Sequence, residues 1–182
     1  MKRYPSIFND ALSPVTPGPS SSNTCGPARI ARTCRRLFGA APVVARVRMS
    51  NKGNYKMSFR GMRSDLAFLT GFLDRDVTDP RFLRAASDAK EAGLSMIEEY
   101  TDDLPGFPTA LAVITLESAI GESMSFRTVS RGGGAFVIEE ADGFSVQITG
   151  DCFETLIFTS ASALTERAEE LCRAVPGSSR YY

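Results

Sequence analysis

A series of short apolar or alternating segments, separated by turn residues, fills the second half of the chain and constrains its fold most. The segments are residues 94–100, 109–117, 123–129, 135–140, 144–149 and 155–159. Asp142 and Gly143 form a tight hairpin signal between two of them. Strands this short, joined by turns, predict a sheet that is largely antiparallel.

Helical patterns flank and precede these segments. We expect short helices over residues 5–12 and 64–73, a helix between Asp79 and Gly93, and an amphipathic helix over 162–174. Apolar residues at helical spacing, followed by Gly39, predict a further helix over 25–38. Residues 43–49 and 55–60 alternate around a turn-like stretch and predict a β-hairpin. The sum is an α+β fold, a largely antiparallel mixed sheet with helices packed on it.

Length and composition predict one compact domain with a short appendage. With 182 residues, we expect a main domain over residues 1–150 and a C-terminal strand-helix appendage over 151–182. A formal net charge of zero and 43% hydrophobic residues are typical of a soluble globular protein and argue against nucleic-acid binding. The apolar runs are too short to span a bilayer and no signal peptide is visible, so we expect a cytoplasmic protein without membrane contact.

The chain contains no histidine, which limits the chemistry it can perform. Histidine is the side chain that most often transfers protons near neutral pH, so any catalysis must use other groups or a partner's groups. The cysteines are Cys25, Cys34, Cys152 and Cys172. Their spacing matches no metal-ligand pattern, so we expect buried free thiols and assign no metal ligand to this chain.

A loop rich in hydroxyl groups lies immediately before the helix over 25–38. Ser20, Ser21, Ser22, Asn23 and Thr24 follow a stretch rich in proline and serine. Free amides and the dipole at a helix N-terminus favour an anion such as a carboxylate or phosphate, which these side chains would help to bind. The alternative is a turn that only caps the helix, with Thr24 as the N-cap residue.

The same loop resembles a family signature. Residues 4–8 read Tyr-Pro-Ser-Ile-Phe and residues 18–24 read Gly-Pro-Ser-Ser-Ser-Asn-Thr. Together they resemble the N-terminal signature of iron-sulfur-dependent L-serine dehydratases, whose usual form ends in Ser-Ser-Ser-His-Thr. Residues 61–65, 107–109 and 130–134 are similar to that family's Gly-His-Gly-Thr-Asp, His-Pro-Asn and Ser-x-Gly-Gly-Gly segments. The resemblance covers residues 4–150.

The resemblance implies a β domain, also called an allosteric substrate-binding domain, that works with a separate catalytic α domain or chain. In that family the α part holds a [4Fe-4S] cluster, whose iron acts on the substrate hydroxyl. Removal of the α-proton gives aminoacrylate, which hydrolyses to pyruvate and ammonia. The implied partners are thus an α-like chain that carries the cluster and a small amino acid that is substrate or effector.

Three histidine positions of the family pattern carry other residues here: Asn23, the Met62-Arg63 pair and Phe107. These side chains cannot take up a proton near pH 7, so the substrate or the chemistry is expected to differ. Arg63 adds a fixed charge able to hold a carboxylate in a bidentate way. The residues expected to bind substrate or an anion are Ser20, Ser21, Ser22, Asn23, Thr24, Arg63, Ser64, Gly132, Gly133 and Gly134.

Two candidate catalytic residues each have a structural alternative. Cys25 lies in the first turn of a predicted helix, where the dipole would lower its pKa, or it is a packed thiol. Asp65 is a general base, or a cap or dipole partner at a helix start. The three consecutive glycines either let the backbone approach a ligand or form a turn between strands. The appendage resembles the opening strand and helix of a regulatory ACT domain.

Three functions remain open at this point. The first is the β subunit of a serine-dehydratase-like lyase acting on serine or a related β-substituted amino acid. The second is a non-catalytic amino-acid-binding or regulatory module with the same fold. The third is a stand-alone enzyme with a repurposed pocket that uses Asp65, Cys25 or the serines.

Overall fold

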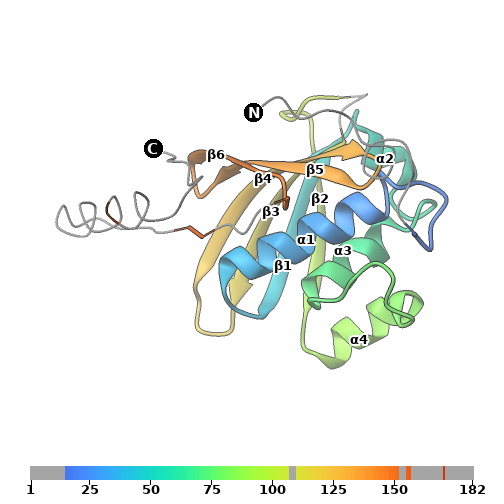
Figure 1. The fold of residues 1–182 in the computed structure, drawn as a ribbon, viewed down its shortest axis with the longest axis horizontal. Helices are drawn as coiled ribbons and strands as arrows, with labels where there is room; N and C mark the ends of the chain where they lie inside the picture. The colour runs from blue at the N-terminus through green and yellow to red at the C-terminus, as the bar shows by residue number, and fades with distance from the viewer. Residues whose placement is uncertain (1–14, 107–109, 152–154, 157–169, 171–182) are drawn as a thin grey trace.

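Six strands form a single mixed sheet in the computed structural model, and the helices lie against it (Figure 1). The structure describes residues 15–106, 110–151, 155, 156 and 170. The helices are α1 (Cys25–Phe38), α2 (Asn54–Ser58), α3 (Ser64–Phe72) and α4 (Ala85–Glu91), with a 3-10 turn at Phe82–Arg84. The strands are β1 (Pro42–Ser50), β2 (Ser95–Thr101), β3 (Ala110–Ser118), β4 (Ser123–Gly132), β5 (Ala135–Ala141) and β6 (Phe144–Ile148).

The order of the strands is β2-β1-β3-β4-β5-β6, and one pair is parallel. β1 and β2 run parallel, while each of the other neighbouring pairs is antiparallel. A parallel pair needs a crossover connection, and α2, α3 and α4 supply it between β1 and β2. The predicted α+β class and the largely antiparallel mixed sheet are therefore confirmed.

The predicted hairpin of residues 43–49 and 55–60 is wrong. β1 pairs with β2 and β3, and residues 54–58 form α2. Tyr55 and Phe59 are four residues apart, so a helix turns both rings toward Phe68 on α3, at centroid distances of 5.8 and 6.0 Å. Burial of this aromatic cluster outweighs the short alternating pattern that predicted a strand.

Most other predicted elements agree with the structure. α1 has the predicted bounds, and Gly39 after it has a φ of 78°, the left-handed conformation that ends many helices. The helix expected from Asp79 begins later, with the 3-10 turn and then α4. The helices expected at 5–12 and over 162–174 lie outside the described residues, apart from residue 170. So does most of the strand expected at 155–159, and with it the predicted appendage.

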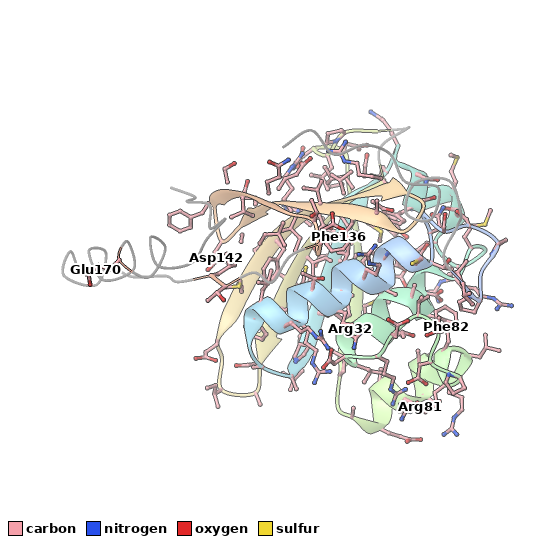
Figure 2. All side chains as sticks on the ribbon, in the orientation of Figure 1. Arg32, Arg81, Phe82, Phe136, Asp142 and Glu170 are labelled. Carbon is pink, nitrogen blue, oxygen red and sulfur yellow. The ribbon has the colours of Figure 1, made fainter. Side chains whose placement is uncertain are left out.

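The core lies between the sheet and α1 and α3. Val47, Ile114 and Phe126 are in register across β1, β3 and β4, and each is at most 1% exposed. Figure 2 shows side chains filling the space between α1 and the sheet, with Phe136 of β5 pointing toward the helix. The guanidinium carbon of Arg29 lies 5.3 Å from the centre of the Phe136 ring. This packing fixes the N-terminal half of α1, which directly follows the hydroxyl-rich loop.

Candidate functional site

Asn23 is the point at which the hydroxyl-rich loop, α2 and α3 meet. Its side-chain oxygen accepts a hydrogen bond from Ser58 of α2 at 3.0 Å, and its backbone carbonyl accepts one from Ser64 of α3 at 2.7 Å. Its amide nitrogen donates to Ser20 Oγ at 3.0 Å and Ser22 Oγ at 3.3 Å. Asn23 is only 5% exposed, so these bonds replace those it would make with water.

β4 holds the same loop from the other side. Ser130 near the end of β4 donates to the carbonyl of Ser22 at 3.0 Å. Gly26 makes room for this contact, since a Cβ there would stand 2.3 Å from the Ser130 hydroxyl. We call Ser20, Ser22, Asn23, Ser58, Ser64 and Ser130 the serine-asparagine junction.

Three backbone amides around the start of α1, where amides free for an anion are expected, are engaged. The amides of Asn23 and Thr24 donate to the Ser20 carbonyl at 3.2 and 3.0 Å, and that of Gly26 donates to the Ser21 carbonyl at 2.9 Å. The loop therefore closes the start of α1 with its own carbonyls. Ligand recognition here would depend on the hydroxyl groups of the loop more than on the helix amides.

Thr24 occupies the predicted N-cap position of α1, but its hydroxyl bonds elsewhere. The Thr24 hydroxyl donates backwards to the Ser20 carbonyl at 2.6 Å, and it makes no cap hydrogen bond. The residue in the N-cap position of α3 is Arg63, while Ser64 is the first helical residue and binds Asn23. Each hydroxyl contributes to the loop and its junction, and neither satisfies the helix end beside it.

Arg63 adopts a left-handed backbone conformation, with a φ of 61°, that favours glycine. Its guanidinium donates one hydrogen bond to the Pro17 carbonyl at 3.0 Å and is exposed to solvent. Arg63 thus attaches the first part of the loop to the start of α3. The guanidinium has further donors that face solvent and could bind a carboxylate. Carboxylate binding by Arg63 stays a prediction.

Asp65 lies in the first turn of α3, where a negative charge is favourable. One carboxylate oxygen is 3.7 Å from Arg60, which also bonds Glu98 of β2 at 2.6 Å. The other oxygen is buried and has no hydrogen-bond partner among the described residues. This position supports the dipole-partner role, and the general-base role stays a prediction.

Cys25 has a different environment from the one expected of a nucleophile. It is 3% exposed and packs in a small apolar cluster with Ala28, Ala67, Val77 and Phe82. Burial raises the pKa of its thiol and outweighs the opposing charge of Arg29, which runs against the lowering expected from the helix dipole; the catalytic role of Cys25 stays a prediction. The packed thiol is the alternative that this environment favours. Cys34 is likewise buried, and burial raises its pKa strongly.

Gly132 ends β4, and Gly133 and Gly134 form the turn to β5. Gly132, Gly133 and Gly134 have φ values of 87°, 60° and 79°, which residues with a side chain rarely adopt. A Cβ at Gly132 or Gly133 would meet nothing within 4 Å, so no close backbone approach requires glycine there. The Gly134 carbonyl accepts a hydrogen bond from Arg29 at 2.7 Å, which ties this turn to α1.

Sequence reasoning brought together Ser20, Ser22, Asn23 and Ser64 but missed Ser58 and Ser130. Ser130 opens the Ser-x-Gly-Gly-Gly segment, of which the sequence analysis predicts only the glycines as site residues. Ser58 fell in the segment wrongly predicted as a strand.

No group of three or more histidine, cysteine, aspartate or glutamate side chains in the described part of the chain could hold a metal ion. Cys25 and Cys34 belong to different apolar clusters, so these residues do not fit an iron-sulfur cluster. Of the helices in the described ranges, none has the length and apolar character needed to cross a bilayer.

Comparison with known proteins finds two relatives that agree in name. The chain is 36% identical over 149 residues to a probable L-serine dehydratase, beta chain, of Bacillus subtilis, covering 82% of this chain and 66% of that protein. It is 27% identical over 142 residues to the L-serine dehydratase, beta chain, of Peptoniphilus asaccharolyticus, covering 78% of this chain and 63% of that protein. It thus spans slightly less than two-thirds of the length of both relatives. No protein-family model matches the chain.

Proposed function

The chain belongs to the family of L-serine dehydratase β chains, and on this premise we propose that it is the β subunit of a serine-dehydratase-like lyase. In this proposal it works in the cytoplasm with an α-like chain that holds a [4Fe-4S] cluster. The substrate is serine or a related β-substituted amino acid. The similarity to two β chains over most of this chain is the observation that carries the proposal.

The roles proposed for this chain and for the α-like chain follow from the side chains that this chain contains. The described residues provide no ligand set for a cluster, so in the proposal the α-like chain supplies it and the chemistry at the substrate hydroxyl. This chain supplies Ser20, Ser21 and Ser22 as hydrogen-bonding groups for the amino acid and Arg63 as a charge for its carboxylate. It has no histidine, so the proton transfer near neutral pH is assigned to the partner or to Asp65.

A second candidate is a non-catalytic amino-acid-binding or regulatory module. One observation favours it: both amide hydrogens, the side-chain oxygen and the backbone carbonyl of Asn23 are engaged within the chain. A group bound in this way holds structure and transfers no proton. In that case the isolated chain would bind an amino acid, which calorimetry would detect, and no α-like chain would be needed.

Anaerobic co-expression with an α-like chain from a neighbouring reading frame tests the first candidate. The proposal expects the two chains to co-purify with iron and to release pyruvate from serine, threonine or cysteine. The α-like chain purified alone is the control and should turn over more slowly. Lack of co-purification, together with amino-acid binding by this chain alone, would favour the regulatory module.

A further inference from the structure

Arg29 joins the first half of α1 to the end of the hairpin formed by β4 and β5. Its guanidinium donates a hydrogen bond to the Gly134 carbonyl at 2.7 Å, across 105 positions of sequence. We call residues 132–134 the glycine segment. Glycine restricts its own backbone less than any other residue, so a contact from outside the segment is needed to favour one conformation of it.

An aromatic ring limits the positions that this guanidinium can take. The guanidinium carbon of Arg29 lies 5.3 Å from the centre of the Phe136 ring, within the range of a cation–π contact. Phe136 is 3% exposed, and a Cβ at Gly150 would lie 2.8 Å from its ring. The ring is therefore in close contact with both Gly150 and Arg29 and has little room to move.

The same end of the hairpin is held to the hydroxyl-rich loop by Ser130. Its hydroxyl donates to the Ser22 carbonyl at 3.0 Å, although 108 positions of sequence separate the two residues. Gly132 follows Ser130 by two residues, and a strand rises about 3.3 Å per residue, so the glycine segment begins about 7 Å from this contact. The loop and the glycine segment are thus neighbours in the fold.

The other arginines of α1 bind elsewhere. Arg35 donates to a carbonyl of α3 at 2.7 Å. Arg32 and Arg36 bond Asp74, which lies after α3. Among the four arginines of α1, all of them described, Arg29 is therefore the one that reaches the hairpin of β4 and β5.

We propose that Arg29 is a positioning residue of the substrate site, which holds the glycine segment beside the hydroxyl-rich loop so that both can contact one amino acid. Arg29 acts through the Gly134 carbonyl and does not touch the substrate itself. The inference rests on the proposed function for the identity of the substrate, and it adds the glycine segment to the site. The placement of that segment by Arg29 is testable in the chain alone.

Hydrogen exchange of the full chain, without any partner, tests this placement. The peptide covering residues 130–138 should exchange about fivefold faster in Arg29→Met than in wild type, as expected for the loss of one hydrogen bond. Arg29→Lys keeps a cation near Phe136 and a donor for the carbonyl, so it should stay within about twofold of wild type. Arg35→Met is the matched control, because it removes a bond of the same length from the same helix and should leave this peptide unchanged.

Exchange in Arg29→Met equal to wild type would overturn the proposal. An equal rise in the peptide covering residues 44–50 of β1 would also overturn it, since the variant would then have lost stability throughout the sheet.

The complex with the α-like chain tests the effect on the substrate. Arg29→Met should raise the KM for the amino acid about fivefold and leave kcat within about twofold, while Arg29→Lys and Arg35→Met keep the wild-type KM. An unchanged KM in Arg29→Met would overturn the role at the site. Absence of turnover by the wild-type complex would contradict the proposed function, whereas hydrogen exchange would still decide whether Arg29 places the glycine segment, so the two failures are distinguishable.

Discussion

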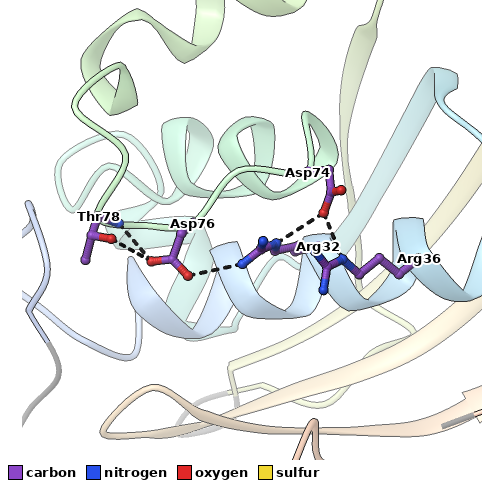
Figure 3. A network of polar contacts seen from close by, with 5 residues as sticks. All are labelled: Arg32, Arg36, Asp74, Asp76 and Thr78. Carbon is purple, nitrogen blue, oxygen red and sulfur yellow. Dashed lines mark hydrogen bonds and ion pairs between the residues drawn. The ribbon is translucent and has the colours of Figure 1, made fainter. Parts of the chain in front are cut away.

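The serine-asparagine junction and the outer side of α1 use opposite chemistry to hold the chain together. At the junction, neutral hydroxyl and amide groups join four segments in a buried environment. On the outer side of α1, Arg32 and Arg36 bond Asp74 at 3.1 and 2.9 Å, and Arg32 reaches Asp76 at 3.2 Å (Figure 3). The Asp76 side chain is 56% exposed, so solvent and salt weaken this second network.

The two networks should therefore respond differently to mutation, salt and pH. A buried neutral network costs much to break and responds little to salt or pH, whereas an exposed ionic network costs little and responds to both. The loop that carries the proposed substrate contacts is held by the first kind. Its geometry should therefore persist across conditions that loosen the surface of α1.

The largest effect is expected at Asn23. Asn23→Leu removes the acceptor of Ser58 and the donors to Ser20 and Ser22, which should lower the free energy of unfolding by about 3 kcal/mol. The same loss should appear at low and high salt. Urea denaturation measures it, and Asn51→Leu, at an exposed position, is the matched control. A loss below that of Asn51→Leu would contradict the central place given to Asn23.

The packing beneath the ionic network should give the next largest effect. A Cβ at Gly71 of α3 would lie 2.3 Å from the Ala28 carbonyl of α1, so Gly71→Ala must push the two helices apart. We expect a loss of about 2 kcal/mol by thermal or urea unfolding. Gly61→Ala is the control, because a Cβ there meets nothing within 4 Å. Equal stability of the two variants would show that α1 and α3 are not so closely packed.

Two substitutions of Arg63, at the edge of the junction, distinguish the effect of backbone strain from the effect of the lost side-chain contact. Arg63→Ala loses the bond to Pro17 and keeps a side chain in the left-handed conformation, while Arg63→Gly loses the bond but relieves the strain. We expect Arg63→Gly to be more stable than Arg63→Ala by about 1 kcal/mol. Paired melting curves under one buffer measure the difference. The reverse order would mean that residue 63 is not left-handed in solution.

The smallest effect is expected on the outer side of α1. Burial disfavours the charge on Asp74, but hydrogen bonds and charges from Arg36 and Arg32 outweigh it and lower its pKa. A lowered carboxyl pKa stabilises the fold above the usual aspartate value and loses that contribution as the pH falls below about 4. Asp74→Asn should therefore cost about 0.5 kcal/mol at neutral pH and low salt, since the pair is partly exposed.

The cost of Asp74→Asn should diminish in 1 M salt, where the Debye length is about 3 Å, and also at acidic pH. Denaturation at two salt concentrations and two pH values checks both dependences. A cost that is unchanged in high salt would place this network with the buried kind and remove the contrast.

The sequence predicts the fold correctly where the apolar periodicity agrees with the positions of residues that end helices and strands. The bounds of α1 follow from its apolar spacing and Gly39, and the strands from β3 to β6 follow from alternation between turn residues. The parallel pairing of β1 with β2 could not be predicted, because it depends on the crossover helices and on no local pattern. The five-residue α2 was missed because aromatic packing across α2 and α3 decides it.

At the candidate site, too, local sequence patterns do not predict the contacts that depend on the folded chain. The resemblance at residues 18–24 predicts a site in the loop, and the chemistry of a helix N-terminus predicts free amides there. The amides are engaged by carbonyls only three to five residues earlier, an outcome of the local turn that composition does not reveal. The roles of Ser58 and Ser130 depend on contacts across 35 and 108 positions of sequence, so no spacing rule could find them.

The most direct test of the proposed β-subunit role is a titration. Pyruvate release from serine by a cluster-containing α-like chain is measured while this chain is added, as wild type and as Asn23→Leu. The rate should rise and saturate near one β chain per α chain, and Asn23→Leu should need more protein or reach a lower rate. A rate that stays unchanged as wild-type chain is added would contradict the β-subunit assignment.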